Sequence, residues 1–222
     1  YVSPSVWAWR RGRAKAMATY LRKVLALLPF EPAFFRAEAG LDCEYVGHPA
    51  IEKIASPEEG AAFREEKGIE PDAPVLLALP GSRTNEVKRL IDLMGKTAAQ
   101  VAARHKGLRV VIPVVPHVQG LVVEAVKDWP IEPVLAFGDD EKRGAFAAAT
   151  AAIAASGTVS LELGLAGIPM VVAYKIDPIA AWSVSRFLKV PTVVLVNLIL
   201  DRPAVKEFLQ HNCKSEDLSA AL

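Results

Sequence analysis

Residues that usually carry redox or metal chemistry are scarce in this sequence. Its 222 residues include only two cysteines, Cys43 and Cys213, and four histidines. The cysteines lie far apart, and the histidines form no HExxH or comparable cluster, so the sequence offers no metal-ligand spacing. We therefore expect two reduced thiols in a cytoplasmic protein, and no metal site.

Other common signals are missing as well. The formal net charge is only +1, so the overall charge does not indicate a nucleic-acid partner. No apolar run is long enough and free enough of charge to span a bilayer. No strand is followed by G-x-G-x-x-G, which argues against a dinucleotide-binding dehydrogenase. A composition of 52% hydrophobic and 23% charged residues is that of a globular protein with a sizeable core.

The most informative stretch is a strand that runs into a helix. The apolar run 75–79 predicts a buried strand, Pro80 and Gly81 break it, and a helical pattern follows. Such a turn brings free backbone N–H groups and the positive end of the helix dipole together, which suits a phosphate. Arg83 stands at the helix entrance, where its guanidinium can bind two phosphate oxygens at once. The alternative is an ordinary turn in which Ser82 caps the helix and Arg83 is solvated.

A second turn of the same kind follows later in the chain. Residues 151–155 predict another buried strand, and Ser156, Gly157 and Thr158 open another helix. Ser156 is a suitable N-cap, and Gly157 allows a ligand to approach the backbone. Glu162 lies about one turn into this helix, among leucine and alanine residues. Two phosphate-binding turns and a nearby carboxylate indicate a nucleotide site.

The remaining segments alternate between strands and helices. Further strands are predicted at 109–115, 134–137 and 170–174, and Gly167 suits the left-handed end of the helix before the last of them. This alternation implies right-handed βαβ units and a parallel sheet. Pro113 moves its strand toward an edge or an end of the sheet, because proline cannot donate to the ladder. Ligands of such sheets bind at the carboxyl ends of the strands, where both turns lie.

The two turns also belong to a longer series of segments typical of one family. These segments are 1–10, 28–31, 46–49, 79–83 with Glu86, 155–158 with 161–162, 169–174, 189–191, 197–198, 202–203 and 207–210. In these segments, in their order and in their spacing, the sequence resembles lipid A disaccharide synthase. The resemblance implies a Rossmann-like α/β fold, the C-terminal, donor-binding half of a two-domain GT-B glycosyltransferase.

The resemblance also implies a reaction. An acylated glucosamine would pass from its UDP carrier to the primary hydroxyl of an acylated glucosamine phosphate, with inversion at the anomeric carbon and without a metal or a cofactor. Arg83 and the two helix N-termini would stabilise the negative charge that develops on the departing UDP. Glu162 would accept hydrogen bonds from the ribose hydroxyls. The alternatives are another UDP-sugar enzyme of the same architecture and a noncatalytic nucleotide-binding fragment.

Three residues near the end of the chain are further binding candidates by the same resemblance. Asn197 interrupts the apolar run 193–200 and needs hydrogen-bond partners if it is buried. Glu207 and Gln210 are expected one helical turn apart on a shared face. All three are expected near the donor or the interdomain cleft. Family members typically have the segment Leu-Pro-Asn-Leu-Leu-Ala-Gly-Arg at this point. Residues 195–202 here are Leu-Val-Asn-Leu-Ile-Leu-Asp-Arg, so the proline and the glycine are absent.

We expect two parts in the chain. Residues 1–50 are interpreted as the remnant of an N-terminal acceptor domain, and residues 51–222 as the C-terminal nucleotide-sugar-binding domain with terminal helices. The initiator methionine and the Gly-rich opening typical of the family are absent, so we expect a fragment. Such a fragment would bind UDP weakly and transfer no sugar, because the general base and the acceptor site would lie in the missing domain. It would also expose apolar surface around Trp7 and Trp9.

The first part holds a basic cluster. The chain is expected to begin with the end of a strand at 1–3, and a helix is expected to follow toward Leu28. Residues 24–28 fit either the end of this helix or a short strand, and we favour the strand. The cluster consists of Arg10, Arg11, Arg13 and Lys15. It could face anionic lipid, although a solvated helix face is the simpler interpretation. The family implies a peripheral protein on the inner face of the cytoplasmic membrane. An amphipathic helix predicted at 178–188 fits core packing best, with membrane contact or a homodimer as alternatives.

Overall fold

A computed structural model describes residues 1–3, 5–177 and 190–222 of the chain. Its centre is a parallel sheet of six strands in the order β5-β4-β3-β6-β7-β8. The strands are β3 (Val75–Leu79), β4 (Arg109–Val114), β5 (Val134–Phe137), β6 (Ala151–Ala155), β7 (Met170–Tyr174) and β8 (Lys206–Leu209). All five residues of β3 are buried, as expected for a strand covered on both faces. The predicted parallel α/β sheet is therefore confirmed.

The position of Pro113 confirms one of its two expected placements. Strand β4 lies inside the sheet, between β5 and β3, so the expectation of an edge strand is wrong. The pairing of β4 with β3 ends at Val111, opposite Leu77. Pro113 comes after that point and pairs only with Ala136 of β5, so its missing N–H interrupts no bond to β3. It is the last residue but one of β4, near the end of the strand.

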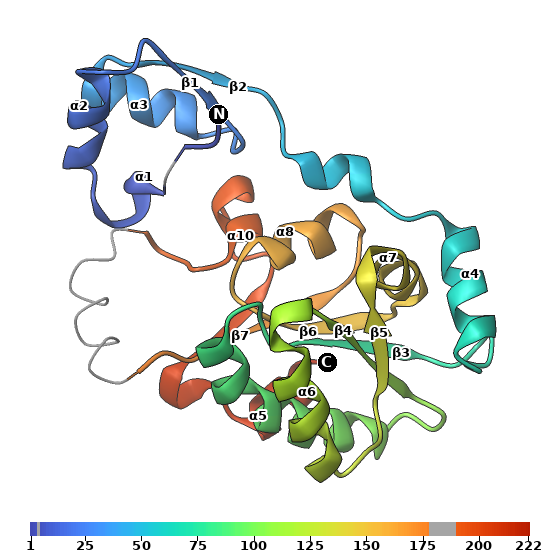
Figure 1. The fold of residues 1–222 in the computed structure, drawn as a ribbon. Coiled ribbons are helices and arrows are strands. Elements are labelled where there is room, and N and C mark those ends of the chain that lie inside the picture. The colour runs from blue at the N-terminus through green and yellow to red at the C-terminus, as the bar shows by residue number, and fades with distance from the viewer. Residues whose placement is uncertain (4, 178–189) are drawn as a thin grey trace.

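Helices cover both faces of the sheet (Figure 1). One face carries α5 (Thr84–Ala102), α6 (Gln119–Ala125) and α11 (Ser215–Ala221), with short turns η2 (Pro116–Val118) and η3 (Val126–Asp128) beside α6. The other carries α4 (Pro57–Glu66), α7 (Gly138–Ala148) and α8 (Thr158–Leu165). Two apolar cores result, one on each side of the sheet.

Helices α4 and α7 pack closely because each has a glycine where they meet. A Cβ atom added to Gly60 would lie 2.8 Å from the backbone carbon of Ala147. A Cβ atom added to Gly144 would lie 2.7 Å from the Cβ of Phe63. Any larger residue at Gly60 would force the two helix backbones apart.

The first part of the chain forms a small unit of its own (Figure 1, blue). Its parallel strands β1 (Lys23–Ala26) and β2 (Asp42–Tyr45) pack with α1 (Val6–Trp9), α2 (Gly12–Ala18) and α3 (Glu31–Ala39). Helix α2 ends at Ala18 and a strand starts at Lys23, so the helix predicted toward Leu28 is too long, whereas the strand predicted at 24–28 is confirmed. Residues 1–3 form no strand, and Val2 only donates one hydrogen bond to the carbonyl of Leu25.

This unit packs against the helices beside the large sheet. Trp7 is only 8% exposed and forms an apolar cluster with Leu28 and with Leu161 of α8. Phe30 meets the ring of Trp7 edge to face, with centroids 5.0 Å apart. The expectation of exposed apolar surface at Trp7 is therefore wrong. The chain then passes through η1 (Pro49–Lys53) to α4.

The end of the chain differs most from expectation. Within the apolar run 193–200 the structure has a helix, α10 (Leu195–Leu200). Glu207 lies in β8, and Gln210 begins the short turn η4 (Gln210–Asn212), so the prediction that both share a helical face is wrong. Residue Asp201, which stands where the family pattern has glycine, adopts a left-handed conformation with φ of 49°. The helix predicted at 178–188 lies outside the described residues.

Candidate functional site

Both predicted turns open into one cavity of about 560 Å³ at the carboxyl ends of β3 and β6. Two adjacent parallel strands deliver their turns to the same edge of the sheet, which explains why turns far apart in the sequence meet. The predicted residues that line the cavity are Gly81, Ser82, Arg83, Ser156, Gly157, Thr158 and Glu162. Within the described residues, these seven surround one space large enough for part of a nucleotide.

The first turn depends on Gly81 and Glu86. Gly81 has φ of 110°, and a Cβ atom there would lie 2.8 Å from the Cβ of Glu86, so only glycine fits. Glu86 accepts a hydrogen bond from the backbone N–H of Ser82 at 3.3 Å and one from the guanidinium of Arg83 at 2.7 Å. The residue before α5 is Arg83, and no side chain caps this helix, so the alternative in which Ser82 is the cap is wrong.

Arg83 remains available to a ligand. Its side chain is 81% exposed, and its ion pair with Glu86 is the kind of exposed pair that contributes little free energy. An anion with two oxygens can therefore replace Glu86 as a partner of the guanidinium at small cost.

The second turn is supported by a hydrogen bond to the loop that contains Val193. The hydroxyl of Ser156 donates to the carbonyl of Val193 at 2.7 Å. Helix α8 begins after Gly157, and Ser156 does not cap it, so the predicted N-cap role is wrong. A Cβ atom on Gly157 would meet nothing within 4 Å, so the space beside this backbone is open, as predicted.

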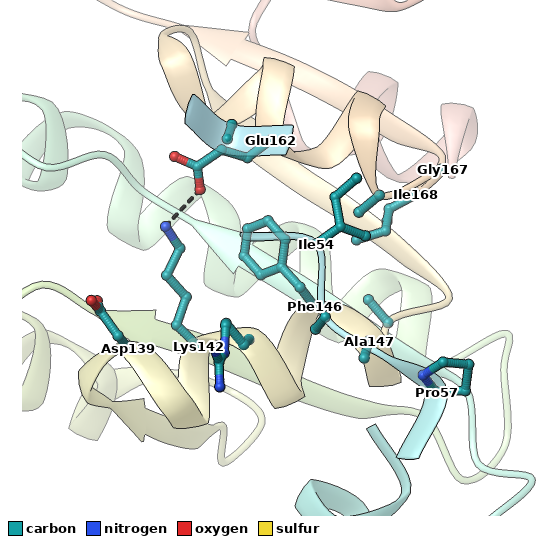
Figure 2. Close-up of a pocket in the computed structure, with 14 residues that line it drawn as sticks. Ile54, Pro57, Asp139, Lys142, Phe146, Ala147, Glu162, Gly167 and Ile168 are labelled. Atoms are coloured by element: carbon teal, nitrogen blue, oxygen red, sulfur yellow. Dashed lines mark hydrogen bonds and ion pairs between the residues drawn. The ribbon is translucent and has the colours of Figure 1, made fainter. Parts of the chain in front are cut away.

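Glu162 forms an ion pair that the sequence did not indicate. Its carboxylate accepts a hydrogen bond from the ammonium of Lys142, on α7, at 2.6 Å (Figure 2). The side chains are 29% and 38% exposed, so both polar ends can still reach a ligand. Lys142 also lies over the ring of Phe146 at 5.4 Å. In the sequence, a role for Lys142 was indicated only by its spacing of four residues from Phe146, which places both on one helix face. Its pairing with Glu162 was not indicated, because Glu162 is distant in sequence.

This ion pair separates the large cavity from a smaller one of about 350 Å³ between α7, α8 and the segment after η1. Figure 2 shows Ile54, Phe146 and Ile168 along the smaller cavity, with Asp139 and the Lys142–Glu162 pair at one end. Asp139, Lys142 and Glu162 line both spaces. The smaller cavity is thus mostly apolar and ends in charged groups.

The three remaining candidates use their polar atoms within the protein. Asn197 is 4% exposed, and its side-chain amide donates to the carbonyl of Val205 at 2.9 Å and accepts from its N–H at 2.8 Å. Glu207 accepts from the N–H of Val193 at 3.1 Å. Gln210 accepts from the N–H of Ile176 at 3.1 Å. None of the three is among the described residues that line the large cavity.

Glu207 nevertheless supports the site through a loop. Its carboxylate accepts a hydrogen bond from the N–H of Val193, and the carbonyl of Val193 accepts one from the hydroxyl of Ser156. One carboxylate on β8 thereby fixes the loop that supports the second turn. Sequence reasoning predicted Glu207 as a site residue but did not identify this contact, which depends on tertiary structure.

The described part of the chain contains no group of three or more histidine, cysteine, aspartate or glutamate side chains that could hold a metal ion. Cys43 and Cys213 are free and buried, and burial raises the pKa of both thiols. None of the described helices has the length and hydrophobicity needed to cross a bilayer.

Comparison with known families identifies relatives along the whole chain. The sequence model of the family described as lipid-A-disaccharide synthetase matches residues 1–222. The lipid-A-disaccharide synthase of Rhodospirillum centenum is 50% identical over 222 residues, which are 100% of this chain and 55% of that protein. The corresponding proteins of Nitrobacter winogradskyi and Bradyrhizobium diazoefficiens are 46% and 44% identical, with 100% of this chain and 56% of each protein covered.

Solved structures show the same fold at low sequence identity. WaaG, a glycosyltransferase involved in lipopolysaccharide biosynthesis, is similar over 90% of this chain and 51% of its own, with a TM-score of 0.51 and 14% identity. Alr3699/HepE of Anabaena, solved in complex with UDP and glucose, is similar over 99% of this chain and 59% of its own, with a TM-score of 0.52 and 15% identity. These similarities confirm the predicted fold class, a Rossmann-like α/β sheet of the GT-B type.

Proposed function

The chain belongs to the lipid-A-disaccharide synthetase family, and from this premise we propose that it holds the UDP part of a sugar donor. The chain spans 55–56% of the length of the three curated relatives described above. The reaction proposed for the whole enzyme transfers an acylated glucosamine from UDP to an acylated glucosamine phosphate, with inversion and without a metal. Residues 51–222 would supply the donor site, and residues 1–50 would belong to the acceptor domain.

The observation that carries this proposal is the meeting of the two turns in one cavity. A diphosphate between them would accept hydrogen bonds from the N–H groups of residues 156–158 and from the guanidinium of Arg83. Helix α8 has eight residues and points its N-terminus at this place, which adds a favourable partial charge. The backbone N–H groups are fixed before the reaction, and Arg83 would join them when its guanidinium leaves Glu86, so together they can stabilise the charge that grows on the leaving UDP.

Glu162 would bind the ribose. Its carboxylate lies one helical turn beyond the second turn of the site, and Lys142 holds one of its oxygens at 2.6 Å. The other oxygen has no hydrogen bond among the described residues and can accept one from a ribose hydroxyl. We assign Glu207, Asn197 and Gln210 to supporting the loops around the donor. Attachment to the inner face of the membrane and a homodimer remain part of the proposal for the whole enzyme.

Calorimetric titration of the purified chain with UDP and with uridine tests the proposal. Hydrogen bonds to charged groups contribute about 1.5–3 kcal/mol each. We therefore expect Arg83→Ala to weaken UDP binding by about tenfold or more and to leave uridine binding nearly unchanged. Glu162→Gln should weaken the binding of both UDP and uridine.

Lys88→Gln is the matched control, because Lys88 is exposed on the same helix as Arg83 but does not line the large cavity. UDP binding that neither Arg83→Ala nor Glu162→Gln affects would refute the assignment of the site. Failure of the unaltered chain to bind UDP would refute the proposed function.

A further inference from the structure

A third cavity, of about 500 Å³, shares Arg83 and Glu86 with the large cavity and is rich in positive charge. Arg83, Arg89 and Lys175 line it together with Tyr174, and Glu86 is its only acidic lining residue among those described. Arg83 directly precedes α5, Arg89 lies in the second turn of that helix, and Lys175 directly follows β7. Three cations from two elements thus face one space with a single carboxylate.

Two of these cations have no counter-ion among the described residues. Glu86 pairs with Arg83, whereas neither Arg89 nor Lys175 forms a hydrogen bond or an ion pair with any described residue. Lys175 is half-buried, and its ammonium loses solvation that no group of the described residues replaces. The cavity therefore has a surplus of two positive charges, which matches a phosphate monoester of about −1.5 to −2 at neutral pH.

Tyr174 adds a neutral donor to this cavity. Burial raises the pKa of its hydroxyl, Glu86 raises the pKa further and Arg83 opposes the change. The hydroxyl thus keeps its proton at neutral pH and can donate to a phosphate oxygen.

The cationic cavity is adjacent to the proposed donor cavity. Arg83, Glu86 and Ser156 line both spaces. Glu162 lies in the donor cavity and not among the lining residues of the cationic one. A nucleoside diphosphate with its ribose at Glu162 and its diphosphate at Arg83 would fill the donor cavity up to the shared wall. Arg89 and Lys175 would then remain free beyond the diphosphate, because they line the cationic cavity and not the donor cavity.

We propose that this cationic cavity, through Lys175 and Arg89, binds the phosphate monoester of the acceptor sugar. The inference rests on the proposed function, since it places a second phosphate beside a bound UDP-sugar. Arg83 at the shared wall would touch the donor diphosphate, and the two unpaired cations would hold the acceptor phosphate. The donor-binding domain would thereby recognise the phosphate of the acceptor, in contrast to the expectation that the whole acceptor site lies in the N-terminal domain.

Titration of the purified chain with glucosamine 1-phosphate, followed by nuclear magnetic resonance with and without saturating UDP, tests this site. We expect both ligands to bind together. Lys175→Met and Arg89→Gln should each lower the affinity for glucosamine 1-phosphate about tenfold, the size of one charge-assisted hydrogen bond, and change UDP affinity less than about twofold. Lys175→Arg should restore most of the loss, which separates the charge from a folding effect.

The controls separate phosphate recognition from its alternatives. Lys88→Gln, next to Arg89 but outside the cavity, should leave both affinities unchanged. Inorganic phosphate should bind with the same dependence on Lys175, and glucosamine without phosphate should not.

Two outcomes would overturn the inference. Displacement of UDP by glucosamine 1-phosphate would show that the cations serve the donor diphosphate. Affinity for glucosamine 1-phosphate that does not change in Lys175→Met and Arg89→Gln, while UDP still binds, would refute the acceptor site and leave the proposed function intact.

Discussion

Glu31 is a buried carboxylate on which the small N-terminal unit depends. It is 3% exposed and accepts hydrogen bonds from the indole of Trp7 at 3.1 Å, from the N–H of Leu28 at 2.9 Å and from the hydroxyl of Ser3. Three donors from separate points of the chain thus converge on one side chain. Removal of the Glu31 carboxylate would leave these three donors buried without an acceptor.

We expect Glu31→Ala to lower the free energy of unfolding by about 3 kcal/mol or more, since each buried donor left unpaired costs about 1–3 kcal/mol. Denaturant unfolding followed by tryptophan fluorescence measures the change. Glu38→Ala on the same helix is the control, because its ion pair with Arg11 is partly exposed and should contribute less than about 1 kcal/mol. Equal effects of the two substitutions would contradict the role of Glu31.

At the same scale, the sequence identified the site residues whose role depends on backbone conformation. Gly81 and Gly157 were recognisable because each comes two residues after a buried strand, where a glycine usually marks a turn that needs its conformational freedom. Lys142 and the support from Glu207 were not recognisable, because each contact joins residues on different elements. The left-handed Asp201 could be inferred only from the glycine typical of the family at that position.

At the scale of elements, the contact between α4 and α7 sets how closely two helices of one face approach. We expect Gly60→Ala to destabilise the protein by about 1–3 kcal/mol, because the new methyl group would meet the backbone of Ala147 at 2.8 Å. Gly120→Ala in α6 is the matched control, since a Cβ there meets nothing within 4 Å and should stabilise by up to about 1 kcal/mol. Thermal unfolding of both variants measures the difference, and a stabilising Gly60→Ala would show that the helices can move apart freely.

The same two helices are joined by an ion pair that makes stability depend on pH. Lys67, after α4, contacts Glu141 of α7 at 2.8 Å. Burial alone would raise the pKa of Glu141, but hydrogen bonds from Lys67 and from the N–H of Phe137 lower it below its usual 4.5. The hydrogen bond to Glu141 raises the pKa of Lys67 above 10.5, against the effect of burial.

The contribution of Glu141 is therefore complete above about pH 4.5 and is lost as the pH falls through its lower, folded-state pKa. That of Lys67 is complete below about pH 10.5 and is lost as the pH rises through its raised pKa. We expect Glu141→Gln to cost about 0.5–1 kcal/mol at neutral pH and progressively less in acid. Melting temperatures of both proteins across the acid range measure this, and a difference that persists at the lowest pH would contradict the role of the pair.

The strands and helices around the site were predictable because each hydrophobic pattern is flanked by residues typical of turns. The buried run of β3 lies between Pro74 and Pro80-Gly81, and that of β6 ends before Ser156-Gly157, which favours a short strand over a helix in both places. The longer run 193–200 lies between Pro191 and Pro203, and an apolar run of this length fits a helix as well as a strand. The place of Glu207 in β8 was missed because the strand is short and becomes one only by pairing with β7.

At the scale of the whole molecule, the N-terminal unit and the large sheet are connected through α8. Leu161 packs with Trp7 and Leu28 of the small unit, and the next residue, Glu162, faces the donor cavity. Packing between the two parts thereby helps to fix the helix that carries the proposed ribose-binding carboxylate. The sequence predicted two parts but not this contact, because an apolar pattern does not identify the surface that covers it. The expectation that the chain binds UDP without transferring sugar stays a prediction.

A crystal structure of the chain with UDP would locate the donor directly. We expect the diphosphate between Arg83 and the N–H groups of residues 156–158, and a ribose hydroxyl within hydrogen-bonding distance of Glu162. We also expect the guanidinium of Arg83 to leave Glu86 for the diphosphate, and Lys175 and Arg89 to make no contact with UDP. A diphosphate bound at Lys175 and Arg89, or UDP in the smaller cavity of Figure 2, would contradict the proposed donor site.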